Sequence, residues 1–129
     1  MDPIWVGQFA VTAFFAIALL QSGLDKFIDS AGNLSWLTGH FANSPLKNIV
    51  PAMFWTIAVL ETLAGILSTI GAIILLFGGG GGLALWGLIL SIISLLCLFF
   101  GQRLAKDYGG AVVIASYFAV ALVGLLLFK

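Results

Sequence analysis

Long stretches without a charged residue constrain the fold of this chain more than any other feature. No Asp, Glu, Lys or Arg lies between Asp2 and Asp25, and none lies between Ala111 and Phe128. A helix of about 20 mainly apolar residues is long enough to cross the ~30 Å hydrocarbon core of a bilayer. Hydrophobic residues make up 62% of the chain and charged residues 8%. A soluble domain of this size cannot bury so much apolar surface, so we expect an integral membrane protein.

Charged residues and turn formers divide the chain into expected membrane spans. The five glycines at 78–82 predict a tight turn between the second and third spans, because each glycine costs about 1 kcal/mol in a helix relative to alanine. The predicted fold class is an all-α, integral membrane four-helix bundle that forms one domain over residues 1–129. The expected spans are residues 4–24, 51–77, 83–100 and 108–128.

The one long connection covers residues 25–50. Its mixture of apolar and polar residues, with Trp36 and Phe41 among the apolar ones, predicts a short amphipathic helix on the membrane surface. Asn33 or Ser35 is the expected N-cap of that helix, because short polar side chains satisfy the first backbone N–H groups of a helix.

Four spans place both termini and the glycine turn on one side of the membrane, which we call side A. Residues 25–50 and 101–108 then lie on the opposite side, side B. Side A has Lys129 alone, whereas side B carries the other Lys and Arg residues, Lys26, Lys47, Arg103 and Lys106. The excess of Lys and Arg in cytoplasmic loops predicts that side B is cytoplasmic and that both termini are outside.

Glu61 is the one acidic or basic residue expected deep within a span. It lies 10 residues after Pro51, which places it at most ~15 Å below side B at a rise of 1.5 Å per residue. An ionisable residue within the membrane is costly and is a functional candidate by default. The residues on the same helical face, Gly65, Ser68 and Ala72, are small. We expect another helix to pack closely on that face, so that Glu61 points into the bundle.

Polar residues of the other spans are expected at a similar depth. They indicate a polar layer, or a shallow pocket, that opens toward side B. The expected members of this layer are Gln21, Ser22, Ser94, Cys97, Ser116 and Tyr117. We predict that Glu61 forms a hydrogen bond with at least one of Gln21, Ser94, Ser116 and Tyr117.

Three interpretations of Glu61 remain open. It is a structural carboxyl group that sets the helix register, a ligand or proton site, or a side chain that reaches toward the interface. Burial in hydrocarbon disfavours the charged form, and a neutral carboxyl group can donate a hydrogen bond to a quinone carbonyl. No nucleophile–base pair, metal cluster or dinucleotide motif is present in the sequence, so a non-catalytic protein without a metal is expected. A net charge of zero argues against a nucleic-acid partner.

Each of two further groups of residues has a purely structural interpretation and a functional one. The polar residues on side B are expected to form a solvated rim, with the docking of a partner or an anionic headgroup as the alternative. Three alanines at intervals of four residues in the last span indicate close helix packing, either within the molecule, which we favour, or with a partner. The rim residues are Asp25, Lys26, His40, Arg103, Lys106 and Asp107, and the alanines are Ala111, Ala115 and Ala119.

Several sequence elements resemble those of the DoxX-like membrane proteins, and together they cover nearly the whole chain. The most specific elements are Gly-Leu-Asp-Lys at 23–26 and Glu61 followed by Gly65. The chain departs from the family at the glycine turn, where members often carry charge, and in lacking an arginine at the start of the first span. The other elements are residues 21–29, Gly-Asn-Leu-Ser-Trp-Leu at 32–37, His40-Phe41, the segment 45–51, Gly71, and Arg-Leu-Ala-Lys-Asp-Tyr-Gly-Gly at 103–110.

The resemblance implies a four-helix protein of a bacterial inner membrane that works with redox partners. Some DoxX-like proteins are subunits of quinone-linked oxidoreductases of sulfur metabolism, and others join membrane complexes that handle oxidative stress. The expected function is therefore that of a small accessory subunit of a redox-linked, quinone-linked complex with a polar site around Glu61. The alternatives are a small proton or solute transport element and a scaffold without a ligand. The expected partners are membrane lipid and other membrane subunits, and the expected ligand is a non-covalently bound quinone or lipid.

Overall fold

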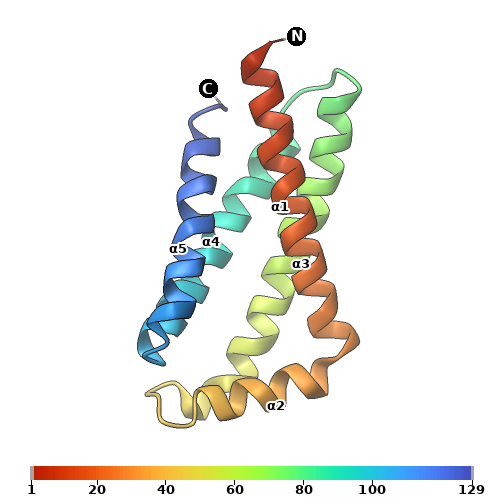
Figure 1. Cartoon of the computed structure of the whole chain (residues 1–129). Helices are drawn as coiled ribbons and strands as arrows, with labels where there is room; N and C mark the ends of the chain where they lie inside the picture. Colours follow the sequence, from red (N-terminus) through yellow and green to blue (C-terminus); the bar gives the residue numbers. More distant parts are fainter. Residues whose placement is uncertain (1, 129) are drawn as a thin grey trace.

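A computed structural model describes residues 2–128 and confirms the predicted fold class, because the described residues are almost entirely helical and contain no strand. Four helices are long and apolar enough to cross a membrane. Both termini and the α3–α4 turn lie at one end, and α2 lies across the other (Figure 1). The elements are α1 (Pro3–Ile28), α2 (Ser30–His40), the short 3₁₀ helix η1 (Lys47–Ile49), α3 (Val50–Leu76), α4 (Gly82–Leu104) and α5 (Tyr108–Leu125).

Aspartate side chains cap the N-termini of three helices. Asp2 caps α1 and Asp107 caps α5, each by accepting a hydrogen bond from a backbone N–H of the first turn. Asp29 caps α2 by accepting a hydrogen bond from the N–H of Gly32 at 3.2 Å. The predicted α2 cap was therefore wrong. Asn33 lies within the helix, where its amide donates to the carbonyl of Asp29 at 2.9 Å.

The glycine turn ends α3 in a Schellman arrangement. Gly78 has a φ of 85°, a left-handed conformation that glycine adopts without the steric penalty of a Cβ atom. The N–H of Gly78 donates to the carbonyl of Leu75 at 3.1 Å, and the N–H of Gly79 donates to that of Ile74 at 2.8 Å. These bonds satisfy carbonyls that the helix end leaves unpaired and allow the chain to reverse into α4.

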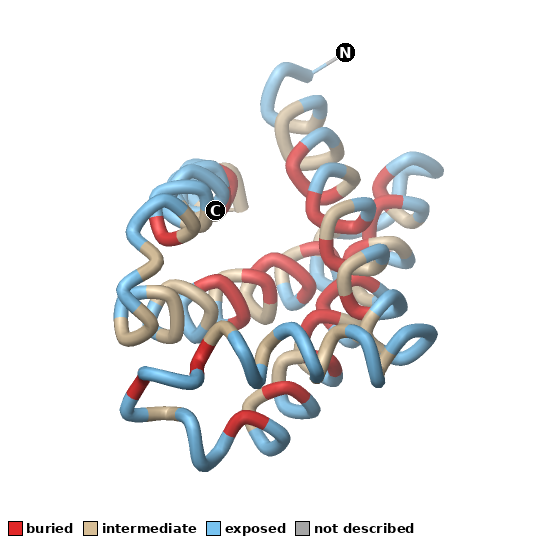
Figure 2. Tube along the Cα trace, turned by 60° about the horizontal axis from the view of Figure 1, so that its bottom comes forward, coloured by how far each residue is buried: buried red, intermediate tan, exposed pale blue. Residues whose placement is uncertain are grey.

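The membrane helices pack in the order α1, α3, α4, α5, with far less contact between the first and the last. Glycines permit the close contacts. A Cβ atom at Gly65 would lie 2.5 Å from the Cα atom of Leu20 in α1, and one at Gly71 would lie 2.6 Å from that of Ala84 in α4. In the view of Figure 2, α5 stands apart from α1. An apolar groove lies between these two helices, lined in part by Gly7 and Ala119.

The orientation of α5 differs from the prediction. Ala111 is buried, but Ala115 is exposed and Ala119 is exposed within the groove beside α1, so the alanine stripe does not pack within the molecule along its whole length as expected. Ile114 and Phe118 of α5 instead pack against the core. Because these larger side chains offer more dispersion contact with α4 than alanine does, they define the inward face of the helix.

Candidate membrane-interface site

Lys26 of α1 pairs with Glu61 of α3. The Lys26 Nζ atom lies 2.7 Å from Glu61 Oε1, and the two side chains are 16% and 2% exposed. Lys26 also donates a hydrogen bond to Ser22 Oγ at 2.9 Å. The contact is therefore an ion pair at close range.

The pair exists because α1 is longer than the apolar run predicts. The expected span ended at residue 24, whereas the helix continues to Ile28. Lys26 therefore has a helical position, and its long side chain reaches the buried carboxylate instead of water. The assignment of Lys26 to the solvated rim was wrong.

The predicted hydrogen-bond partners of Glu61 do not reach it. The hydroxyl of Ser94 donates to the carbonyl of Leu90 at 2.9 Å, and Ser116 bonds in the same way within its own helix. Gln21 is exposed, and the ring of Tyr117 packs against Phe14 of α1 with the ring centres 5.8 Å apart. The predicted hydrogen bonds to Glu61 are absent for a physical reason. Serine hydroxyls in helices readily donate to the carbonyl four residues earlier, whereas the buried carboxylate requires a cation.

The residues of α3 that share the helical face of Glu61 are small. Gly65, Ser68 and Ala72 are all buried. Gly65 lies against the backbone of α1, and Ser68 lies against Gly87 of α4, where a Cβ atom would lie 2.7 Å from the Ser68 nitrogen. The Ser68 hydroxyl has no hydrogen-bond partner within the described part of the chain. Glu61 thus faces the interior of the bundle and not the lipid.

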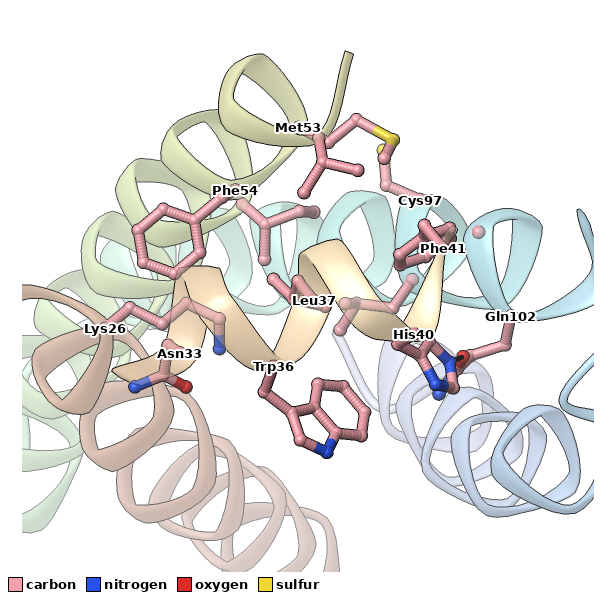
Figure 3. A pocket seen from close by; sticks show the side chains of 14 residues that line it. Lys26, Asn33, Trp36, Leu37, His40, Phe41, Met53, Phe54, Cys97 and Gln102 are labelled. Atoms are coloured by element: carbon pink, nitrogen blue, oxygen red, sulfur yellow. Dashed lines mark hydrogen bonds between the residues drawn. The ribbon is translucent and has the colours of Figure 1, made fainter. Parts of the chain in front are cut away.

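A cavity of about 220 Å³ lies beneath α2, between the side-B ends of α3 and α4. Polar side chains stand at two separated places around it (Figure 3). Lys26 and Asn33 lie at one end, and His40 and Gln102 lie at the other. The remaining lining is mostly apolar and includes Phe54, which is 1% exposed. The cavity therefore has an apolar middle and polar ends. Lys26 lines it directly, whereas Glu61 does not line it and is linked to it through its ion pair with Lys26.

A hydrogen bond ties α2 to the end of α4. The Nε2 atom of His40 lies 2.8 Å from Gln102 Oε1, and 3.5 Å from Asp107 Oδ2. The ring of His40 stacks on that of Trp36, with the ring centres 4.5 Å apart. These contacts hold the C-terminal half of α2 over the cavity, so α2 forms its cover.

The remaining rim residues make local contacts on side B. Asp25 accepts a hydrogen bond from the amide of Asn33 at 3.2 Å. The Arg103 guanidinium lies 4.5 Å from the centre of the Tyr108 ring. Lys106 is exposed and has a φ of 60°. Within residues 2–128, no ion pair joins the charges at the end of α1 to those at the end of α4.

Sequence reasoning missed part of the site. Asn33 and Trp36 of α2 and Gln102 of α4 line the cavity, but no motif marks the three as a set, because Gln102 lies far from the other two in the chain. The sequence signal closest to them was the length of the 25–50 connection, since long connections in small domains are often functional. No three metal-binding side chains come together among the described residues.

The architecture and the candidate site indicate an integral membrane helical bundle with a covered cavity at one membrane boundary. Comparison with protein-family models, curated proteins and solved structures gave no match. The resemblance to the DoxX-like proteins therefore stays a prediction.

Proposed function

We propose that this protein is a non-catalytic accessory subunit of a redox-linked membrane complex, and that it holds the head of a quinone in the cavity beneath α2. The observation that carries the proposal is Lys26, which lines this cavity and is paired with the buried carboxylate of Glu61. Polar groups that converge on an otherwise apolar cavity are typical of a ligand site. Ionisable residues within a membrane protein also mark functional sites more often than structural ones.

The two polar ends of the cavity fit the chemistry of a quinone head. Such a head is a flat, apolar ring with oxygen atoms on opposite edges. Lys26 stands at one end of the cavity and can donate to one oxygen, and the Gln102 amide stands at the other end and can donate to the second. The apolar middle, which includes Phe41 and Phe54, offers aromatic faces on which a flat ring can pack.

The exposed face of α5 supports the role of a subunit. Ala115 is exposed on α5, and small residues allow a helix of another subunit to approach closely in a membrane. Side B carries most of the basic residues of the chain, and we propose that it faces the cytoplasm of a bacterial inner membrane.

Binding of a short-chain benzoquinone to the purified protein in lipid nanodiscs tests the ligand site. We expect saturable binding, weakened about tenfold or more in Lys26→Met and Glu61→Gln. The first change removes a donor that lines the cavity, and the second removes the carboxylate that positions this donor. Thr69→Val is the matched control, since the Thr69 hydroxyl bonds to the carbonyl of Gly65 within α3, away from the cavity. Binding that is unchanged in both site variants, or absent in the wild type, contradicts the proposal.

A further inference from the structure

We infer that the ligand of the cavity beneath α2 is a quinone with a long hydrocarbon chain, which enters sideways from the bilayer and lays its chain along a groove between α3 and α4. This inference rests on the proposed function, and it specifies the class of ligand and the route by which the ligand arrives.

The groove is an open hollow of about 770 Å³ on the outer surface of α3 and α4 near side B. Its lining includes Ile49 and Ala52 from the α3 side and Leu96 and Phe100 from α4. This surface lies on helices that are apolar enough to cross a membrane, so lipid chains are the molecules that surround it. The groove is therefore open to the bilayer.

The groove continues into the cavity. Four residues line both hollows, namely Met53 and Ile57 of α3 and Cys97 and Gly101 of α4. Figure 3 shows Met53 and Cys97 together on one side of the cavity. At this boundary Gly101 has no side chain, Cys97 has a small one and Met53 has a flexible one, whereas Ile57 is branched and stiff. A molecule with its head beneath α2 thus has a direct path for a chain into the groove.

The chemistry of the groove selects a hydrocarbon chain. Its two polar residues are Thr56 and Arg103. The Thr56 hydroxyl already donates to the carbonyl of Ala52 at 2.7 Å, and Arg103 stacks on Tyr108 at the side-B edge. A polar chain would therefore have no hydrogen-bond partners in the middle of the groove, which makes it costly to accommodate.

The groove between α1 and α5 provides an internal comparison. It is also apolar and open to lipid, and it is lined by residues that include Phe14 and Val123. It shares no lining residue with the cavity beneath α2. A chain that merely dissolves in the surrounding lipid would contact both grooves, whereas a chain tethered to a head beneath α2 would contact the α3–α4 groove alone.

The experiment uses a long-chain benzoquinone with a photoreactive diazirine at the end of its chain, bound to the full-length protein in nanodiscs. We expect the photoproduct on residues of the α3–α4 groove, such as Thr56 and Leu96, and expect excess tailless benzoquinone to abolish it. Thr56→Phe fills the groove without touching the cavity and should lower this labelling about tenfold, because overpacking displaces the chain. Val59→Phe is the control, because Val59 is exposed on α3 and lines neither hollow.

Labelling in the α1–α5 groove, or equally over all lipid-facing helices, overturns the inference, as does full labelling of Thr56→Phe. Dependence on Arg103 without competition by the tailless quinone indicates a bound anionic phospholipid and also overturns it. Failure of the tailless quinone to bind contradicts the proposed function itself. Normal binding of the tailless quinone in Thr56→Phe shows that the head site is intact.

Discussion

Lys26 and Glu61 form an ion pair between two of the four long apolar helices, with Nζ and Oε1 2.7 Å apart and the glutamate side chain 2% exposed. The pair joins α1 to α3 at the level where α2 begins to cover the bundle. The two residues depend on each other, because an unpaired charge in hydrocarbon is costly.

Removing one member of this pair should destabilise the protein more than removing both. Lys26→Met leaves a buried carboxylate without a cation, and breaking a buried pair from one side costs about 3–5 kcal/mol. The double variant Lys26→Met/Glu61→Gln should regain most of that loss, because no uncompensated charge remains. Thermal unfolding in detergent measures the cycle. Additive losses in the two single variants would show that the residues are not coupled.

Gly65 should tolerate no side chain. An added Cβ atom would meet the Leu20 Cα and backbone nitrogen at 2.5 Å, so Gly65→Ala must push α1 away from α3. We expect a loss of about 1–3 kcal/mol from overpacking. Gly39→Ala in α2 is the matched control, since its Cβ atom would meet nothing within 4 Å. It should be neutral or stabilising by up to about 1 kcal/mol. Equal effects of the two substitutions would refute the packing argument.

His40 should hold α2 closed over the cavity. His40→Ala removes the contacts with Gln102 and Asp107, and losing such a hydrogen bond costs about 1 kcal/mol. Backbone amides of α2 should then exchange with deuterium about fivefold faster, as measured by mass spectrometry. Thr38→Ala serves as the control, because the Thr38 hydroxyl bonds within α2, to the carbonyl of Leu34. Unchanged exchange in His40→Ala would show that α2 is held by its apolar contacts alone.

Side B should face the cytoplasm if the bias in Lys and Arg determines the orientation. In a Cys97→Ser background, a membrane-impermeant thiol reagent added to intact cells should label Gly80→Cys in the glycine turn. It should not label Ser35→Cys in α2 until the cells are opened. Both positions are exposed in the structure, so accessibility within the fold is matched. The reverse pattern would place α2 outside.

The outward face of α5 should be the contact with a partner subunit. Ala115→Trp adds a large side chain to an exposed position and should abolish co-purification of membrane partners in mild detergent, since close helix approach requires small residues. Val113→Trp, also on an exposed position of α5, controls for the effect of bulk. Loss of partners in both variants, or in neither, would contradict the assignment.

Sequence periodicity and composition predict the membrane helices of this protein closely, and the helix boundaries show where that approach ends. The glycine turn and the spans can be predicted because they depend on the residue types within a short stretch of sequence. The end of α1 does not, because Asp25 and Lys26 look like a solvated terminus until their neighbours in space are known. The same holds for α5, whose inward face depends on which side chains fill the space beside α4.

The sequence by itself determined a four-helix membrane bundle and singled out Glu61 as its buried carboxylate. The first conclusion rests on the cost of glycine within a helix, and both rest on the cost of charge within lipid. Only the tertiary structure decided that Lys26 is the partner of Glu61 and that α2, His40 and Gln102 enclose a cavity beside this pair. These residues come from separate helices, and their contacts depend on helix rotation and crossing. Because lipid is itself apolar, the inward and outward faces of a membrane helix differ little in residue type. The sequence therefore indicates little about helix rotation or helix crossing.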